Sequence, residues 1–310
     1  MFDAYNGVRQ EYMPIFHIQP APDNTNVRAA MIAASHTVMV SLFPSRKPQL
    51  DASYVASLGA VDGGDPERQR GIDYGVTVAQ AVLAWRATDR FSSPVPAFTG
   101  GTATGQWRPT PPASGAMSAQ SLVFTKLFVL DSDTRFRPPA PRNLSSKAYA
   151  DDFNAVKALG RKNGSTRTED QTALAPFWEG NATIHWNQAA NQAAQANRLG
   201  LSKSVRLFAV LNIAMVDTAI TTWSAKRFYG ADAKTVTWRP VTAIPLADTD
   251  GNPDTAPEAD WQPLINTPSH PEYAAGHPSL NGAAATVLLG EFKDAQTFTL
   301  TTANLPDRRY

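Results

Sequence analysis

His277 has the sequence setting best suited to acid–base chemistry in this chain. It stands in the segment AAGHPS (residues 274–279), directly before a predicted helix that ends at Phe292. Pro278 suits the first position of a helix, and Gly276 lets the backbone turn tightly. The free N–H groups at such a helix start attract anions, and a histidine beside them can transfer a proton near neutral pH. The segment therefore predicts an oxyanion site, with a simple helix cap as the alternative.

Two cations upstream of His277 suit the same kind of site. Lys226 falls at the end of the most apolar predicted helix, and Arg239 lies in WRP (residues 238–240). Together they would hold a tetrahedral oxyanion, with the arginine as a planar fork and the lysine as a point charge. Taken singly, Lys226 could instead complement the dipole of its own helix, and Arg239 could form a surface salt bridge. Lys234, in a predicted loop, is a rival for the lysine role.

Other histidines have settings that favour structural roles. His36 lies inside an alanine-rich predicted helix, where a hydrogen-bonded histidine in a core or groove is expected. His17 and His185 lie in predicted short irregular segments, where surface or packing roles are expected.

Composition excludes several functional classes. The chain has 310 residues, 43% of them hydrophobic, so it can bury a sizeable core. Its formal net charge of +1 excludes the broad basic surface of a general nucleic-acid binder. The absence of cysteine excludes disulfides, thiolate metal sites and cysteine nucleophiles.

Apolar residues recur at helical spacing nearly throughout the chain. TEDQ (residues 168–171) has capping-box spacing and opens a helix that Pro176 should kink or end. Pro-rich segments between the helices predict long irregular loops, and no alternating pattern typical of strands persists. The prediction is an all-α helical bundle with long Pro-rich loops, forming one domain over residues 1–310. The other predicted helices span residues 27–43, 66–86, 146–159, 205–226 and 278–292.

Three segments in order resemble the vanadium-dependent haloperoxidases, which belong to the type 2 phosphatidic acid phosphatase-like enzymes. The family pattern is a lysine, an Arg-Pro pair, a PSGH segment, and a downstream arginine and histidine. Similarity extends through RTEDQT (residues 167–172) to the opening MFDAYN (residues 1–6), so it covers essentially the whole chain. A second Arg-Pro pair at residues 108–109 precedes the lysine helix and is not expected to be the family's pair. The three segments are WSAK (residues 223–226), WRPVTAI (238–244) and HPEYAAGH (270–277).

This resemblance implies a helical bundle of the haloperoxidase and acid phosphatase type, with vanadate as cofactor. Lys226 and Arg239 would bind the equatorial oxygens of vanadate, the Gly276 amide would add a hydrogen bond, and His277 would be the acid–base residue. The implied reaction is oxidation of halide by hydrogen peroxide to a hypohalous species, which halogenates a small organic acceptor. Because phosphate shares the shape and charge of vanadate, a soluble acid phosphatase is the alternative enzyme.

The sequence departs from the family pattern at three places. The spacing from Lys226 to Arg239 is longer, as though residues 230–235 were inserted. Ala275 replaces the motif serine, and loss of that hydroxyl donor is expected to cost about 1–3 kcal/mol. No histidine follows His277, so the axial vanadate ligand and the second arginine are absent. We therefore expect a chain that is incomplete at both ends and binds vanadate poorly.

The same departures leave a third function open, a non-catalytic helical scaffold that acts through partner binding. Membrane lipid phosphatases of this group would need several apolar spans, whereas residues 207–220 and 283–289 are too short. Family members are often oligomers, so a homo-oligomer is possible, although the sequence leaves the oligomeric state open. No signal peptide is recognised at residues 1–5, and localisation stays open because a signal could precede Met1.

Overall fold

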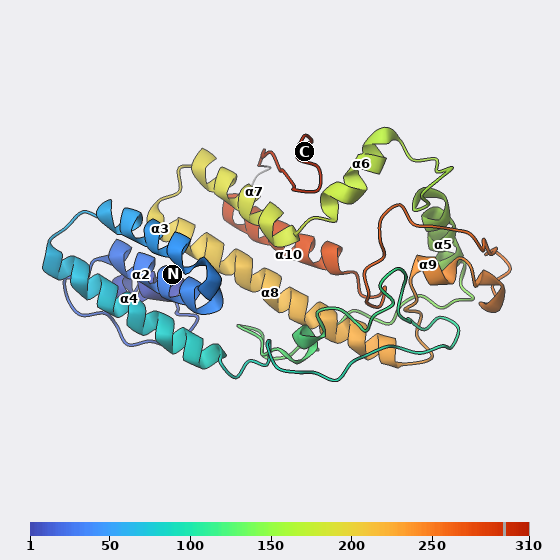
Figure 1. The fold of residues 1–310 in the computed structure, drawn as a ribbon, viewed down its shortest axis with the longest axis horizontal. Coiled ribbons are helices and arrows are strands. Elements are labelled where there is room, and N and C mark those ends of the chain that lie inside the picture. Colours follow the sequence, from blue (N-terminus) through green and yellow to red (C-terminus); the bar gives the residue numbers. More distant parts are fainter. Residues whose placement is uncertain (294–295, 310) are drawn as a thin grey trace. The chain divides into compact units, whose positions relative to one another are not determined.

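Helices joined by long irregular loops make up the computed structural model of the chain (Figure 1), which describes residues 1–293 and 296–309. The described residues contain no β-strand, which confirms the predicted all-α fold. The α-helices are α1 Phe2–Arg9, α2 Val27–Leu42, α3 Lys47–Gly59, α4 Asp65–Arg86, α5 Lys147–Leu159, α6 Glu169–Trp178, α7 Ala182–Ala196, α8 Leu201–Ala231, α9 Pro240–Ala243 and α10 Gly276–Phe292. Short 3₁₀ helices are η1 Pro44–Arg46, η2 Gln120–Phe124 and η3 Ala247–Thr249.

The chain divides into two compact units. The first comprises Met1–Arg90 with Asn197–Val210, and the second comprises Phe91–Ala196 with Leu211–Tyr310. Helix α8 contributes its first part to one unit and the rest to the other. The predicted site residues all belong to the second unit.

The first unit is built on the close packing of α2 against α4. A Cβ atom at Gly75 of α4 would lie 2.2 Å from the carbonyl oxygen of Ala30 in α2, and one at Gly71 would lie 2.5 Å from that of Asn26. Glycine is therefore required at both positions for the two backbones to approach this closely. Alanines of α2 and Val78 of α4 fill the core between them.

In the second unit, α7 lies along α10 (Figure 1). The Trp186 indole N–H in α7 donates to the side-chain oxygen of Asn281 in α10, at 2.8 Å. Buried alanines of α7 allow the close approach, and the side chain of Asn181 accepts a hydrogen bond from the Thr183 N–H at the start of α7. This packing fixes the first turns of α10, where His277 lies.

A second core of this unit surrounds the Arg239 segment. Phe153 of α5 packs with Trp238, Ile244 and Trp261, all of them buried. The Trp261 indole N–H donates to the carbonyl oxygen of Lys157 at 3.0 Å. These aromatic side chains hold the segment that carries Arg239 against α5.

The observed helices correct the sequence prediction at four places. Helix α8 ends at Ala231 rather than at Lys226, so Lys226 does not occupy the last turn. His185 lies within α7 and is buried, not in an irregular segment. Helix α6 has the predicted capping box but continues through Pro176 to Trp178. Helix α3 was not predicted.

By length and hydropathy, α8 is long enough to cross a bilayer, although a buried core helix meets the same criteria. It carries the buried Asp217, whose carboxylate accepts from the N–H groups of residues 128–130 at 2.7–3.0 Å. It also carries the buried Lys226. Buried polar groups with hydrogen-bond partners of this kind are typical of a helix that packs inside a protein.

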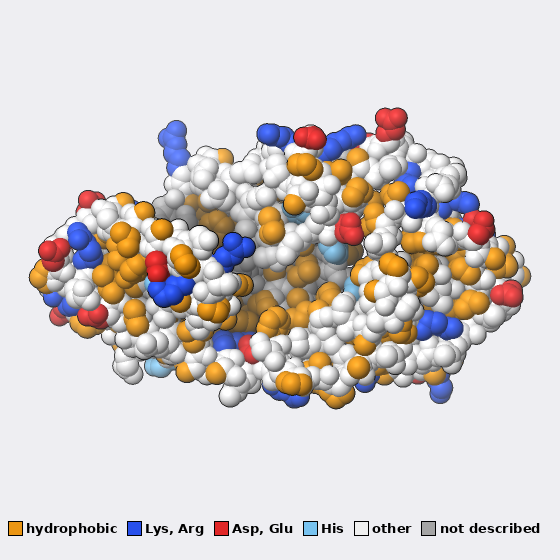
Figure 2. Space-filling view, viewed as in Figure 1, with side chains coloured by type: hydrophobic (Ala, Val, Ile, Leu, Met, Phe, Trp, Pro, Cys, Tyr) orange, Lys and Arg blue, Asp and Glu red, His pale blue; other side chains and the backbone are white. Residues whose placement is uncertain are grey.

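Charged side chains of both signs are scattered over the face shown in Figure 2 without a large patch of one sign. This mixture of signs agrees with the formal net charge of +1.

Candidate oxyanion site

Lys226 is completely buried, and within the described residues its ammonium has only backbone acceptors. Its Nζ donates to the carbonyl oxygens of Pro271 at 2.6 Å and Glu272 at 3.2 Å. Lys226 does not cap the dipole of α8, because the helix continues past it to Ala231. A surface role is also excluded, because the side chain of Lys226 is buried. Carbonyl groups carry no net charge, so the ammonium leaves a positive potential inside the unit.

Burial, with a smaller contribution from the nearby positive charge of Arg239, lowers the pKa of Lys226 to about 7. The carboxylate of Glu272 acts in the opposite direction and raises it. A bound anion would stabilise the charged ammonium and raise this pKa again.

Backbone hydrogen bonds from a distant loop position the segment that carries Arg239. The carbonyl oxygen of Gly105 accepts from the N–H groups of both Thr237 and Trp238, at 2.7 and 2.8 Å. The Thr237 hydroxyl accepts from the Trp107 N–H, and the Thr237 carbonyl oxygen accepts from the Glu272 N–H. Thr237 thus joins the 105–107 loop to residue 272.

Arg239 is 13% exposed and pairs with Glu272, its Nη1 lying 2.5 Å from the carboxylate Oε2. Its Nε is buried and has no hydrogen-bond partner among the described residues. The predicted surface salt bridge therefore exists, but on an arginine that is largely buried and keeps one donor unused. An unused buried donor costs free energy, which an anion at this point would offset.

Trp223 connects the lysine helix to the start of α10. The Lys226 Nζ lies 5.9 Å from the centroid of the Trp223 ring. A Cβ atom at Gly276 would lie 3.4 Å from the same ring, so the first residue of α10 packs directly on Trp223. His270 lies edge-to-face against Trp223 with ring centroids 5.4 Å apart.

His270 is held in its neutral form. Burial first, and then the positive charges of Lys226 and Arg239, lower its pKa to about 3. Its Nδ1 lies 3.1 Å from the carbonyl oxygen of Pro271, the same oxygen that accepts from Lys226. Because its imidazole is uncharged, His270 does not attract an anion away from Lys226 and Arg239.

His277 is exposed in the first turn of α10. Ala275 occupies the N-cap position with extended backbone angles and provides no side-chain cap. His277 forms no hydrogen bond or ion pair with Lys226 or Arg239 in the described part of the chain. Its charge lowers the pKa of the buried His185 in α7, as does burial, so these two histidines lie within electrostatic range of each other.

The structure thus brings Lys226 and Arg239 within electrostatic range of each other, and Gly276 lies against Trp223, the ring that neighbours Lys226. Lys234, the rival lysine, is exposed. Arg108 donates to the carbonyl oxygens of Thr102 and Ala103, which agrees with its exclusion as the family arginine. Sequence reasoning missed Glu272 and His270 as neighbours of the cations, although both lie in the quoted segment at residues 270–277.

Residues 206–307 match the family model of the VCPO second helical-bundle domain. That part of the chain is therefore similar to the helical-bundle domain of this family. The matched segment contains the four predicted site residues, Lys226, Arg239, Gly276 and His277. No curated protein sequence matches the chain.

Solved haloperoxidase structures share the fold of this chain. A bacterial vanadium-dependent iodoperoxidase is 24% identical with a TM-score of 0.74, covering 98% of this chain and 75% of its own. The apo form of a bacterial vanadium-dependent chloroperoxidase is 19% identical with a TM-score of 0.74, over 96% of this chain and 75% of its own. The holo-type structure gives 18% identity and a TM-score of 0.66 over the same shares.

Proposed function

We propose that Lys226, Arg239 and the first turn of α10 bind a tetrahedral oxyanion, and that with vanadate in this place the site oxidises halide with hydrogen peroxide. Because no histidine follows His277 to serve as the family's axial ligand, we expect vanadate to bind weakly. The observation that carries the proposal is a pair of cations, one buried and one largely buried. Among the described residues, Lys226 has only carbonyl acceptors and the buried Nε of Arg239 has no partner. Burying two positive charges costs free energy when no anion lies between them, and a bound oxyanion offsets this cost.

The residues present fit a tetrahedral oxyanion. Lys226 and Arg239 supply positive charge, and the start of α10 supplies backbone N–H groups that no side chain caps. Glu272 opposes anion binding, since its carboxylate already pairs with Arg239. Its side chain is 47% exposed, so it can turn toward solvent when an anion takes its place.

Vanadate, when bound, supplies a Lewis-acidic centre that activates hydrogen peroxide toward attack by halide. Lys226 and Arg239 hold the negative charge of the oxyanion. His277, at the exposed start of the helix, exchanges a proton with a peroxide oxygen at its imidazole nitrogen. Trp223 covers the lysine side and excludes water from it.

Binding of vanadate and of inorganic phosphate to the whole chain, measured by isothermal titration calorimetry, tests the anion site. Lys226→Met is expected to weaken binding of both anions by about tenfold or more, because it removes a buried positive charge. Lys234→Met is the matched control, since Lys234 is exposed, and it should leave binding within about twofold. Equal losses in the two variants would refute the site.

Activity assays separate the reaction types. Bromination of monochlorodimedone with vanadate, bromide and peroxide reports halide oxidation, and hydrolysis of p-nitrophenyl phosphate reports a phosphatase. Bromination that is lost in His277→Ala supports the proposal. Phosphate ester hydrolysis without bromination would assign an acid phosphatase instead, and anion binding without either activity would assign a non-catalytic scaffold.

A further inference from the structure

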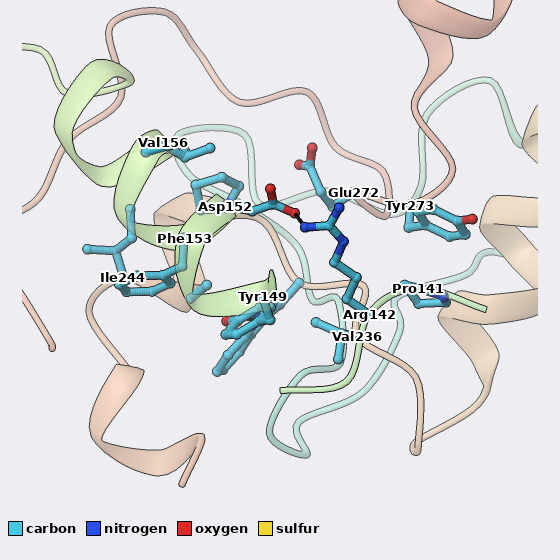
Figure 3. Close-up of a pocket in the computed structure, with 14 residues that line it drawn as sticks. Pro141, Arg142, Tyr149, Asp152, Phe153, Val156, Val236, Ile244, Glu272 and Tyr273 are labelled. Carbon is cyan, nitrogen blue, oxygen red and sulfur yellow. Dashed lines mark hydrogen bonds and ion pairs between the residues drawn. The ribbon is translucent and has the colours of Figure 1, made fainter. Parts of the chain in front are cut away.

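A cavity beside the Arg239 segment is not used by the proposed oxyanion chemistry. Its volume is about 460 Å³, and it lies between α5 and the residues that flank Arg239 (Figure 3). This volume is typical of sites for small organic ligands. Aromatic and branched apolar side chains form most of its wall, chiefly Tyr149, Phe153, Val236, Trp238, Ile244 and Tyr273.

The charged groups at this cavity are already neutralised. Arg142 donates to Asp152 at 2.8 Å, and Figure 3 shows its side chain extending between Asp152 and Glu272. Glu272 pairs with Arg239. A ligand in the cavity therefore meets paired ions, and an uncharged molecule avoids the desolvation cost that a charged one would meet.

Tyr149 provides an unused hydrogen-bond donor in the wall. Its hydroxyl oxygen accepts from the Trp238 indole N–H at 3.1 Å, while its own proton has no acceptor among the described residues. Burial raises the pKa of Tyr149 to about 12, so the hydroxyl keeps its proton at neutral pH. A ligand oxygen is the acceptor that this donor lacks.

We propose that the cavity binds a flat, uncharged aromatic molecule that carries a hydroxyl or carbonyl oxygen, with Tyr149 donating to that oxygen. The rings of Phe153 and Trp238 supply apolar contact for the aromatic plane. Glu272 lines this cavity and also pairs with Arg239, so the ligand lies next to the oxyanion site.

The role of this ligand as halogen acceptor rests on the proposed function. A hypohalous acid made at the oxyanion site would replace one ring hydrogen of the bound phenol with halogen. The hydroxide lost by the acid would leave with the displaced proton as water. Binding itself does not depend on that reaction.

Equilibrium dialysis of the whole chain with 2-naphthol and with naphthalene, without vanadate, peroxide or halide, tests the site. The expected result is one 2-naphthol per chain, bound about fivefold or more tightly than naphthalene because of the hydrogen bond. Tyr149→Phe should abolish this preference. Tyr273→Phe should keep it, because the Tyr273 hydroxyl donates to the carbonyl oxygen of Pro139 instead.

Two exposed alanines of α5 provide a test that leaves the core intact. Ala155 lines the cavity and Ala158 does not. Ala155→Trp should weaken binding of both ligands by about tenfold through filling the cavity, and Ala158→Trp should not.

Unchanged binding in Ala155→Trp would overturn the location, and equal affinity of the wild type for both ligands would overturn the role of Tyr149. Bromination of monochlorodimedone by a chain that binds no naphthol would refute this inference alone, whereas naphthol binding without vanadate-dependent activity would refute only the proposed reaction.

Discussion

His270 and Lys226 share one acceptor, the carbonyl oxygen of Pro271, which lies 2.6 Å from the lysine Nζ and 3.1 Å from the histidine Nδ1. The lysine and the histidine are thereby fixed to the same peptide group. Their pKa values are both lowered by burial, and Lys226 contributes to the shift of His270.

Replacing His270 should reduce the acid sensitivity of the fold. Because its pKa falls from 6.5 to about 3 on folding, the unfolded chain binds more protons between these values, and stability is lost as pH drops through that window. His270→Phe removes this contribution while keeping a ring against Trp223. Thermal melting at pH 7, 5 and 4 should show the variant losing less stability than the wild type. A constant difference between the two proteins across these pH values would contradict the assignment.

Lys226 should produce a pH dependence in the alkaline range. Its pKa falls from 10.5 to about 7 on folding, so the cost of burying the charge is complete below pH 7 and is relieved between pH 7 and 10.5. Stability conferred by this group therefore rises with pH across that window. Lys226→Met lacks the effect. The difference in melting temperature between wild type and variant should therefore shift in favour of the wild type from pH 7 to pH 10. Parallel melting curves at all pH values would show that the buried lysine does not titrate there.

Glu272→Gln should strengthen anion binding. The change removes the carboxylate that pairs with Arg239 at 2.5 Å, and leaves the arginine free for an oxyanion. Inorganic phosphate affinity should rise by about threefold or more in calorimetry. Glu258→Gln is the matched control, because Glu258 pairs with Arg161 away from this site. An affinity that is unchanged in Glu272→Gln, or raised equally in both variants, would argue against competition at Arg239.

Ala275→Ser should stabilise the start of α10. Ala275 already has the extended backbone angles of an N-cap but offers no acceptor to the free N–H groups, and a serine hydroxyl would supply one. The expected gain is about 0.5–2 kcal/mol in chemical denaturation. The added hydroxyl should also improve phosphate binding. Ala275→Val, which has no hydroxyl, should show neither effect, and a gain shared by both variants would point to a cause other than capping.

Much of the fold follows from local signals in the sequence. Asn26 and Ser146 cap α2 and α5 where the apolar spacing begins, and the capping box at Thr168 opens α6. Helix α7 was missed because its buried face is made of alanines, which contribute little to an apolar pattern. The position of His185 was wrong for the same reason.

The site was predictable in its residues but not in their partners. Spacing and motif singled out Lys226 and Arg239, and the structure buries both. The pairing of Arg239 with Glu272 joins residues that are distant in sequence, and the carbonyl acceptors of Lys226 lie in an irregular loop. Backbone conformation of such loops depends on tertiary contacts, for which local sequence gives no signal.

The double hydrogen bond to the Gly105 carbonyl makes the position of Arg239 dependent on a residue that never touches it. Gly105 has a φ of +84°, a conformation that side chains with a Cβ atom rarely adopt. A substitution there would shift the carbonyl and release Thr237 and Trp238 together. A random mutagenesis screen for weakened oxyanion binding should therefore recover changes at Gly105 alongside those at the cations. Such hits would map the loop as a mechanical support of the arginine.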